Sequence, residues 1–87
     1  MNRPDNHLDV VVVVSGVPRP GRINLHEPLD HLVKEVLRAS GDEGRNAGDF
    51  ELRTEDGRLL DLGLTAQDSG LLDGQVLFLN PRAGAGG

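Results

Sequence analysis

The chain has 87 residues, enough for one small domain with a single modest core and too few for a cleft between domains. It contains no cysteine, which excludes disulfides, thiolate metal sites and thiol nucleophiles. The formal net charge of −5 argues against general attraction to nucleic acid or anionic membranes. No apolar stretch approaches the roughly 20 residues of a membrane span, and the first residues lack a signal-peptide core, so cytoplasmic residence is expected.

The first strand is predicted at Val10–Val14, an unbroken run of β-branched residues. Such a run is typical of a strand that is buried on both faces at the centre of a sheet. Residues 1–8 before it are mostly polar and are interpreted as a flexible leader. The folded domain is therefore expected to span residues 9–80, followed by a flexible tail over residues 81–87.

A turn and a second strand follow. The segment from Gly16 to Gly21 contains Pro18 and Pro20, and this composition predicts a turn. Arg22–His26 then alternates polar and apolar residues, as a half-buried strand does. The first two strands are therefore expected to form a β-hairpin.

One amphipathic helix is predicted next. Pro28 suits the first helical turn, where its missing N–H costs nothing, and Gly41 is expected to close the helix. Between them, apolar residues recur at the i, i+3, i+4, i+7 and i+8 spacing that places them on one helical face. These residues are Leu29, Leu32, Val33, Val36 and Leu37.

The second half of the chain predicts shorter elements. A polar loop over residues 42–48 precedes a third strand at Phe50–Arg53, whose residues again alternate. Glu55–Arg58 contains an Asp-Gly pair and predicts a tight turn. Leu59-Leu60 is expected to begin a short fourth strand.

The final strand is predicted at Gln75–Leu79, after a turn at Asp73-Gly74. Before it, Thr65 and Asp68 are spaced to cap one helical or 3₁₀ turn. The predicted fold is α+β, with a mixed four- to five-stranded sheet and one main helix on one face. The first and last strands, which carry the most apolar runs, are expected to lie parallel at the centre.

This order of segments resembles the ubiquitin-like β-grasp over about residues 9–87. The resemblance is carried by three internal motifs and by the final residues, which read Ala83-Gly84-Ala85-Gly86-Gly87. The internal motifs are Leu32–Arg38, Phe50–Arg53 with the turn Gly57–Asp61, and Thr65–Gly74 leading into the last strand at Asp73–Leu79. Together they are similar to the bacterial ubiquitin-like proteins that are encoded beside an activating enzyme, a conjugating enzyme and a JAB-type metallopeptidase.

The resemblance implies a protein modifier that is not itself an enzyme and needs no cofactor. In such a system an ATP-dependent activating enzyme adenylates Gly87 and passes it to a cysteine as a thioester. Gly86 and Gly87 would enter the catalytic channel, because glycine lets the backbone approach closely. The activating enzyme would read Arg82, Ala83, Gly84 and Ala85 along the tail. Arg82 could instead simply make the tail soluble.

Two other functions stay open at this point. Small β-grasp proteins of cofactor synthesis also end in Gly-Gly, so the chain is similar to a sulfur carrier in which Gly87 becomes a thiocarboxylate. A non-covalent interaction domain with an incidental Gly-rich end is the third reading. Genes for a conjugating enzyme and a JAB-type peptidase would favour the modifier, and a role in antiviral defence would fit that setting.

The chain departs from ubiquitin in two respects. If Phe50 and Leu52 point inward, the outward positions of the third strand are Glu51 and Arg53, so the usual aliphatic recognition patch is expected to be absent. Lys34 is the only lysine, so it is the one side-chain amine through which chains could be linked. Hydroxyl groups could also accept the modifier, and the chain offers Ser15, Ser40, Thr54, Thr65 and Ser69.

The remaining candidate sites are interpreted as surface, turn or capping residues. His7, His26 and His31 lack the spacing of a metal site and are interpreted as surface residues. The carboxylate pairs Asp42-Glu43 and Glu55-Asp56 flank glycines and are interpreted as turn residues. The hydroxyl residues are expected to cap helices or turns.

Overall fold

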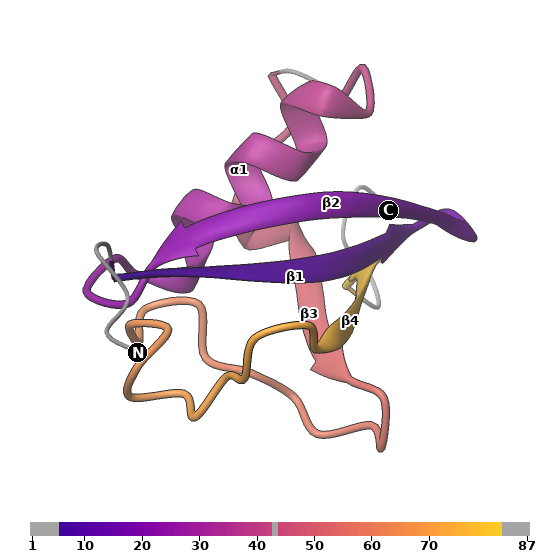
Figure 1. Ribbon diagram of the computed structural model, residues 1–87. Helices are drawn as coiled ribbons and strands as arrows, with labels where there is room; N and C mark the ends of the chain where they lie inside the picture. The colour runs from indigo at the N-terminus through magenta and orange to yellow at the C-terminus, as the bar shows by residue number, and fades with distance from the viewer. Residues whose placement is uncertain (1–5, 43, 83–87) are drawn as a thin grey trace.

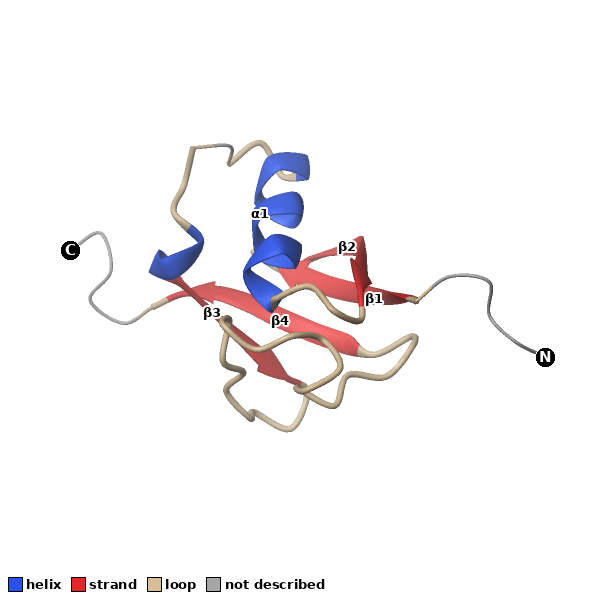
Figure 2. Ribbon diagram, turned by 90° about the vertical axis from the view of Figure 1, so that its left-hand side faces the viewer, coloured by secondary structure: helices blue, strands red, loops and turns tan. Residues whose placement is uncertain are grey.

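The computed structural model describes residues 6–42 and 44–82, which form one layer of sheet and one covering helix. The sheet has four strands in the order β2-β1-β4-β3, and Figure 1 labels the elements. Helix α1 crosses one face of the sheet (Figure 2), and no helix among the described residues covers the other face, which we call the open face. The elements are β1 (His7–Val14), β2 (Val17–Asn24), α1 (Leu29–Ala39), the 3₁₀ helix η1 (Ala47–Asp49), β3 (Phe50–Thr54) and β4 (Val76–Pro81). The predicted α+β arrangement is confirmed.

The centre of the sheet is the parallel pair β1 and β4, as predicted. Val12 lies opposite Leu77, and Val14 lies opposite Leu79. Strand β2 flanks β1 and β3 flanks β4, each in antiparallel pairing. This arrangement brings the two most apolar runs of the chain together beneath the helix.

Strand β1 is covered on one face only, so the expectation of burial on both faces is wrong. Val10, Val12 and Val14 are buried under the helix, whereas Val11 and Val13 are only partly buried on the open face. The sheet has a single covering layer because residues 6–42 and 44–82 supply only one long helix. The strand also begins at His7, inside the predicted leader, because Leu8 belongs to the buried core.

Strand β2 begins earlier than predicted. The turn consists of Ser15 and Gly16, whose φ angles are 51° and 79°. Positive φ at both central residues is the geometry of a tight two-residue hairpin. Pro18 and Pro20 therefore lie within β2, and the turn predicted from residue 16 to residue 21 is wrong. Proline is accepted there because β2 is an edge strand.

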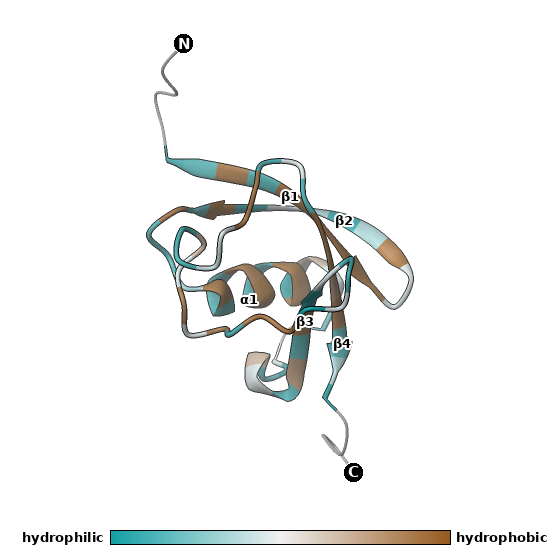
Figure 3. Ribbon diagram, turned by 90° about the horizontal axis from the view of Figure 1, so that it is seen from below, coloured by the Kyte–Doolittle hydropathy of each residue, from teal (hydrophilic) through white to brown (hydrophobic). Residues whose placement is uncertain are grey.

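The helix matches its prediction closely. All five apolar residues of the predicted face are buried, and Figure 3 shows hydrophobic and hydrophilic bands alternating along α1. Pro28 occupies the N-cap position, one residue before the predicted first turn. The chain leaves the helix through Gly41, whose φ is 84°. Beyond the cap, Asp42 donates its N–H to the Leu37 carbonyl at 2.8 Å.

Residues 55–75 form a long connection with turns and no regular strand. Leu59 makes an isolated bridge with Arg53, so the fourth strand predicted at Leu59-Leu60 is wrong. Pairing stops there because Asp61 starts a turn, in which its side chain accepts the Gly63 N–H at 2.9 Å. The predicted Thr65 cap is confirmed, since its hydroxyl oxygen accepts the Asp68 N–H at 3.1 Å.

Strand β4 continues beyond its predicted end. It runs to Pro81, so the first residue of the predicted 81–87 tail is part of the sheet. Pro81 lies opposite Phe50 at the start of β3. The sheet therefore extends to the residue directly before Arg82.

Candidate functional site

The C-terminal end of the sheet is fixed by Arg82. Its backbone N–H donates to the Asp49 carbonyl at 2.9 Å, one residue beyond the last strand pair. Its guanidinium Nη1 donates to the Gly48 carbonyl at 3.1 Å. Both acceptors belong to η1, so Arg82 is bound at a defined place next to β3.

The other predicted residues of the conjugation site lie outside the described residues. They are Gly86 and Gly87 at the reactive end and Ala83, Gly84 and Ala85 between them and Arg82. The structure therefore places one predicted tail residue, Arg82, and leaves the others as predictions.

A pocket of about 310 Å³ lies beside Arg82, and we name it the tail-base pocket. Its apolar lining comes from Phe50 at the start of β3 and from Leu59, Leu60 and Leu62 in the long connection. Glu51 and Asp61 also line it, together with Arg82. The sequence analysis missed this pocket, because its walls come from three separate segments and none of them has a recognisable motif.

Backbone hydrogen bonds hold the long connection against β3 and α1. Leu60 donates its N–H to the Leu52 carbonyl at 2.9 Å, and Thr54 donates to the Arg58 carbonyl at 3.0 Å. On the helix side, Asp30 donates its N–H to the Leu62 carbonyl at 3.1 Å. The tail-base pocket is therefore formed by the fold itself and needs no partner to assemble it.

The open face of the sheet carries a strip of apolar residues. The strand registers place Pro18, Val13 and Phe78 in one row across β2, β1 and β4, and Pro20, Val11 and Val76 in the next. Phe78 and Val76 are partly buried there. The contribution of β1 was not expected, because that strand was predicted to be buried on both faces.

The open-face positions of β3 are charged, as predicted. Phe50 and Leu52 are buried, and Glu51 and Arg53 lie on the opposite face. Arg53 Nη2 lies 3.3 Å from Glu51 Oε1, and Arg53 also donates to the Gly57 carbonyl at 2.8 Å. The apolar strip therefore ends at β4.

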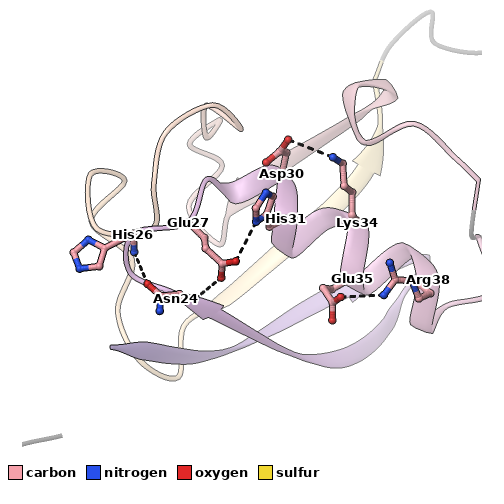
Figure 4. Close-up of polar contacts among 8 residues, drawn as sticks. All are labelled: Asn24, His26, Glu27, Asp30, His31, Lys34, Glu35 and Arg38. Atoms are coloured by element: carbon pink, nitrogen blue, oxygen red, sulfur yellow. Dashed lines mark hydrogen bonds and ion pairs between the residues drawn. The ribbon is translucent and has the colours of Figure 1, made fainter. Parts of the chain in front are cut away.

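Lys34 lies on the solvent side of α1, where 60% of its side chain is exposed. Its ammonium Nζ is 3.7 Å from Asp30 Oδ2, one helical turn earlier, and Figure 4 shows the two side chains facing each other. An exposed pair at this spacing contributes only about 0.3–0.5 kcal/mol. The amine is therefore accessible and only weakly held.

Glu27 organises the entry to the helix (Figure 4). Its Oε2 lies 3.1 Å from His31 Nδ1, and its Oε1 accepts the Asn24 N–H at 3.1 Å. The hydrogen bond with His31, followed by that with Asn24, lowers the pKa of Glu27 below its ordinary value of 4.5. His26 donates its backbone N–H to the Asn24 side chain at 2.9 Å. These contacts are those of a turn and a helix start.

Four of the five hydroxyl residues make the local contacts expected of caps and turns. Ser40 donates to the Val36 carbonyl at 2.7 Å and Ser69 donates to the Thr65 carbonyl at 2.8 Å. Thr54 donates to the Asp56 carboxylate, and this hydrogen bond is the largest cause of a lowered Asp56 pKa. Within residues 6–42 and 44–82, no group of three or more His, Asp or Glu side chains could hold a metal ion.

No helix in the part of the chain that the structure describes is long and apolar enough to cross a membrane.

The comparison with family models decides the family. The model described as "Protein of Unknown function (DUF2604)" matches residues 3–87, which is almost the whole chain. The chain belongs to this family. A curated relative is 30% identical over 89 residues, which cover 95% of this chain and 68% of the relative. That relative is the uncharacterized protein y4jI of Sinorhizobium fredii (strain NBRC 101917 / NGR234).

Solved structures with the same fold are ubiquitin-like. A protein designed de novo on the basis of ubiquitin has a TM-score of 0.76 and 16% identity, covering 93% of this chain and 94% of its own. The ubiquitin of Caldiarchaeum subterraneum has a TM-score of 0.71 and 19% identity, covering 87% of this chain and 94% of its own. The N-terminal ubiquitin-like domain of the 4931431F19Rik protein has a TM-score of 0.72 and 16% identity, covering 94% of this chain and 81% of its own. At these identities the likeness establishes the fold, which is the ubiquitin-like β-grasp.

Proposed function

We propose that this protein is a ubiquitin-like modifier that is attached to its targets through Gly87. The observation that carries the proposal is the position of Arg82 at the end of a ubiquitin-like sheet. Its contacts with η1 fix the point from which the Ala-Gly-Ala-Gly-Gly sequence continues to Gly87. A sequence without large side chains beyond a fixed anchor suits an enzyme channel that must admit a carboxylate and exclude bulk.

The chemistry needs other enzymes and no catalytic residue of this chain. A carboxylate is a poor acyl donor, so an ATP-dependent activating enzyme adenylates Gly87 and a cysteine of that enzyme takes the acyl group as a thioester. A conjugating enzyme then receives the thioester and transfers the acyl group to an amine or hydroxyl of the target. Each covalent relay divides a difficult step into easier ones.

The resemblance to bacterial conjugation systems supplies the remaining partners in this proposal. A JAB-type metallopeptidase removes the modifier from its targets or trims its terminus, and the system operates in the bacterial cytoplasm as part of antiviral defence. The fold alone is shared by proteins of many functions, so these partners depend on the sequence motifs and on the test that follows.

Trypsin provides a direct test, because Arg82 is the last Lys or Arg of the chain. A target joined to Gly87 will keep residues 83–87 on its side chain after digestion, as an Ala-Gly-Ala-Gly-Gly remnant. We expect mass spectrometry of the source organism, expressing the tagged protein, to find this remnant on other proteins. The matched control is the variant that lacks Gly86 and Gly87, which should give none.

The same experiment separates the sulfur carrier from the modifier. A sulfur carrier would yield free protein in which sulfur replaces one oxygen of the terminal carboxylate, with no remnant on other proteins. Hydroxylamine treatment then distinguishes esters, which it cleaves, from amides, which persist. Wild-type cells without any remnant, under conditions in which the protein is abundant, would overturn the modifier proposal.

A further inference from the structure

We propose that the tail-base pocket receives an apolar side chain, next to a Lys or Arg, from the enzyme that acts at Gly87. This inference rests on the proposed function and names a docking site for it on the folded domain. The occupant is a leucine-sized side chain with a neighbouring cation. The pocket's apolar lining, its charge and its distance from the terminus support this assignment.

Part of the apolar lining of the pocket is exposed to solvent. Leu59 is 54% exposed although it lines the pocket beside Phe50, and Leu62 is only partly buried. Single exposed leucines are ordinary on protein surfaces, but an exposed leucine within a concave apolar site offers a complementary surface to another side chain. The pocket volume of about 310 Å³ is large enough for one such group.

The charges around the pocket favour a cationic residue next to the apolar side chain that the pocket receives. Two carboxylates, Glu51 and Asp61, line the pocket with one cation, Arg82, which is bound to the Gly48 carbonyl. Glu51 is already paired with Arg53 at 3.3 Å, so Asp61 is the lining carboxylate that would attract a further cation. The connection that forms the wall is also acidic, because residues 55–75 contain five carboxylates and one cationic residue, Arg58. These carboxylates are Glu55, Asp56, Asp61, Asp68 and Asp73. A Lys or Arg beside the apolar group would therefore be attracted to this surface.

The position of the pocket limits which protein can occupy it. Five residues follow Arg82, and an extended chain of that length spans at most about 17 Å. A standard interface buries roughly 800 Å² on each partner, which corresponds to a round patch about 16 Å in radius. An enzyme that holds Gly87 therefore lies close enough for its footprint to include the pocket beside Arg82.

The sheet edges do not offer a competing mode of docking by strand addition. The edge of β3 is covered, because Leu60 donates to Leu52 and Thr54 donates to the Arg58 carbonyl. The outward positions of edge strand β2 include Pro18 and Pro20, which have no N–H to donate. A partner at this end of the domain must therefore bind through its side chains.

Variants at the pocket separate this inference from the proposed function. Leu59→Gln removes apolar surface from an exposed side chain, and Asp61→Asn removes the charge while keeping the oxygen that accepts the Gly63 N–H. The matched controls are Leu64→Gln and Leu72→Gln, since these leucines are 43% and 70% exposed and do not line the pocket. We expect the first two variants to reduce remnant-bearing conjugates in cells at least tenfold and the controls to stay within twofold of wild type, at equal protein levels.

The outcomes are distinct. If wild type gives conjugates and Leu59→Gln gives as many, the pocket inference is overturned and the proposed function stands. If wild type gives none, the proposed function is overturned and the pocket inference with it. A reduction by Leu64→Gln equal to that by Leu59→Gln would also overturn the pocket inference, because a general loss of surface leucine would then explain both.

A binding measurement tests the chemistry without any enzyme. In NMR titrations with the peptide acetyl-Leu-Arg-Leu-amide, we expect amide shifts at residues 50–51 and 59–63 of wild type. These shifts should be at least fivefold smaller in Leu59→Gln, and acetyl-Leu-Glu-Leu-amide should bind at least fivefold more weakly to wild type. No shifts at millimolar peptide, or equal binding of the two peptides, would overturn the assignment of an apolar and cationic occupant.

Discussion

Pro20 in β2 lies directly opposite Val11 in β1, and the two residues exchange no hydrogen bonds. Val11 directs its N–H away from β2 and donates it to the Gln75 carbonyl at 2.9 Å. Because the pair is antiparallel, the backbone of Pro20 faces the free edge of the sheet, and the same applies to Pro18 two residues earlier. A third edge position, Asn24, already donates its N–H to Glu27. Three of the four outward positions of β2 thus have no N–H available to donate to another strand.

Replacing both prolines should allow the edge of β2 to pair with a strand of another molecule. The variant Pro18→Thr/Pro20→Thr gives the outer edge of β2 two additional N–H groups, and threonine favours strands. We therefore expect concentration-dependent self-association, measured by sedimentation velocity. Val17→Thr is the matched control, because it adds threonine at an exposed position whose backbone faces β1. A double variant that stays monomeric at millimolar concentration would show that the prolines do not protect the edge.

Gly21 is required by the packing between β2 and α1. A Cβ at this position would lie 2.7 Å from Leu32 Cδ1, and the Leu32 side chain is buried and 1% exposed. We expect Gly21→Ala to reduce the free energy of unfolding by about 1–3 kcal/mol, as overpacking does. The φ angle of Gly21 is not positive, so the loss should come from this contact and not from backbone strain.

A double-mutant cycle with Leu32→Val measures that contact. The shorter side chain removes the terminal methyl groups that the Cβ introduced by Gly21→Ala would meet, so the two substitutions together should cost less than the sum of their separate effects. Denaturant unfolding of the four proteins gives the coupling, which is expected to exceed about 0.5 kcal/mol. Strict additivity would contradict the steric explanation.

The helix and the third strand could be predicted because their sequence periods are strong and local. Five residues of one helical face are all buried, and Phe50 and Leu52 alternate with Glu51 and Arg53 as expected. The parallel pairing of β1 with β4 was also predictable, since the two most apolar segments belong at the centre of the sheet.

The errors arose where tertiary context decides the structure. Prolines at 18 and 20 predict a turn unless the strand is known to lie at an edge. The valine run suggests burial on both faces unless the second face is known to be open. The tail-base pocket depends on contacts between β3, the long connection and Arg82, and no short motif encodes such a meeting. The Gly-Gly end was visible in the sequence, and its role stays a prediction.

Glu27 should make the stability of the fold depend on pH. Its pKa in the folded protein is lowered below 4.5, first by the hydrogen bond with His31 and then by that with Asn24. A lowered folded pKa means that the carboxylate stabilises the fold above the unfolded pKa, and this stabilisation is lost as the pH falls through the folded value. Wild type should therefore melt at a higher temperature than Glu27→Gln at pH 7, and the difference should shrink below pH 4.5.

The control for this series is Glu55→Gln, which removes an exposed carboxylate from the long connection. Thermal unfolding followed by circular dichroism between pH 7 and pH 3 gives both comparisons. The Glu27→Gln difference should be larger than the Glu55→Gln difference at pH 7. A Glu27→Gln difference that is constant over the whole pH range would contradict a role for the ionised carboxylate.

Thr54 should control both the stability of the β3 turn and the pKa of Asp56. Thr54 is 5% exposed, and its hydroxyl oxygen accepts the Arg58 N–H at 3.0 Å while donating to the Asp56 carboxylate. Thr54→Val keeps the shape of the side chain and removes both contacts. We expect it to lower the free energy of unfolding by about 0.5–1.5 kcal/mol, because the Arg58 N–H loses its intramolecular acceptor.

The titration of Asp56 provides the second readout for the same variant. In wild type the hydrogen bond from Thr54 is the largest cause that lowers the pKa of Asp56 below 3.8. Without that donor the pKa should rise toward 3.8, which NMR titration of the Asp56 carboxyl carbon measures directly. Because the wild-type carboxylate stabilises the fold above pH 3.8 and loses this effect as the pH falls through its lowered pKa, the difference between wild type and Thr54→Val should narrow in acid. When Asp56 is replaced by Asn, the stability difference between threonine and valine at position 54 should be similarly reduced at neutral pH. An unchanged Asp56 pKa in Thr54→Val would show that the hydroxyl does not hold this carboxylate.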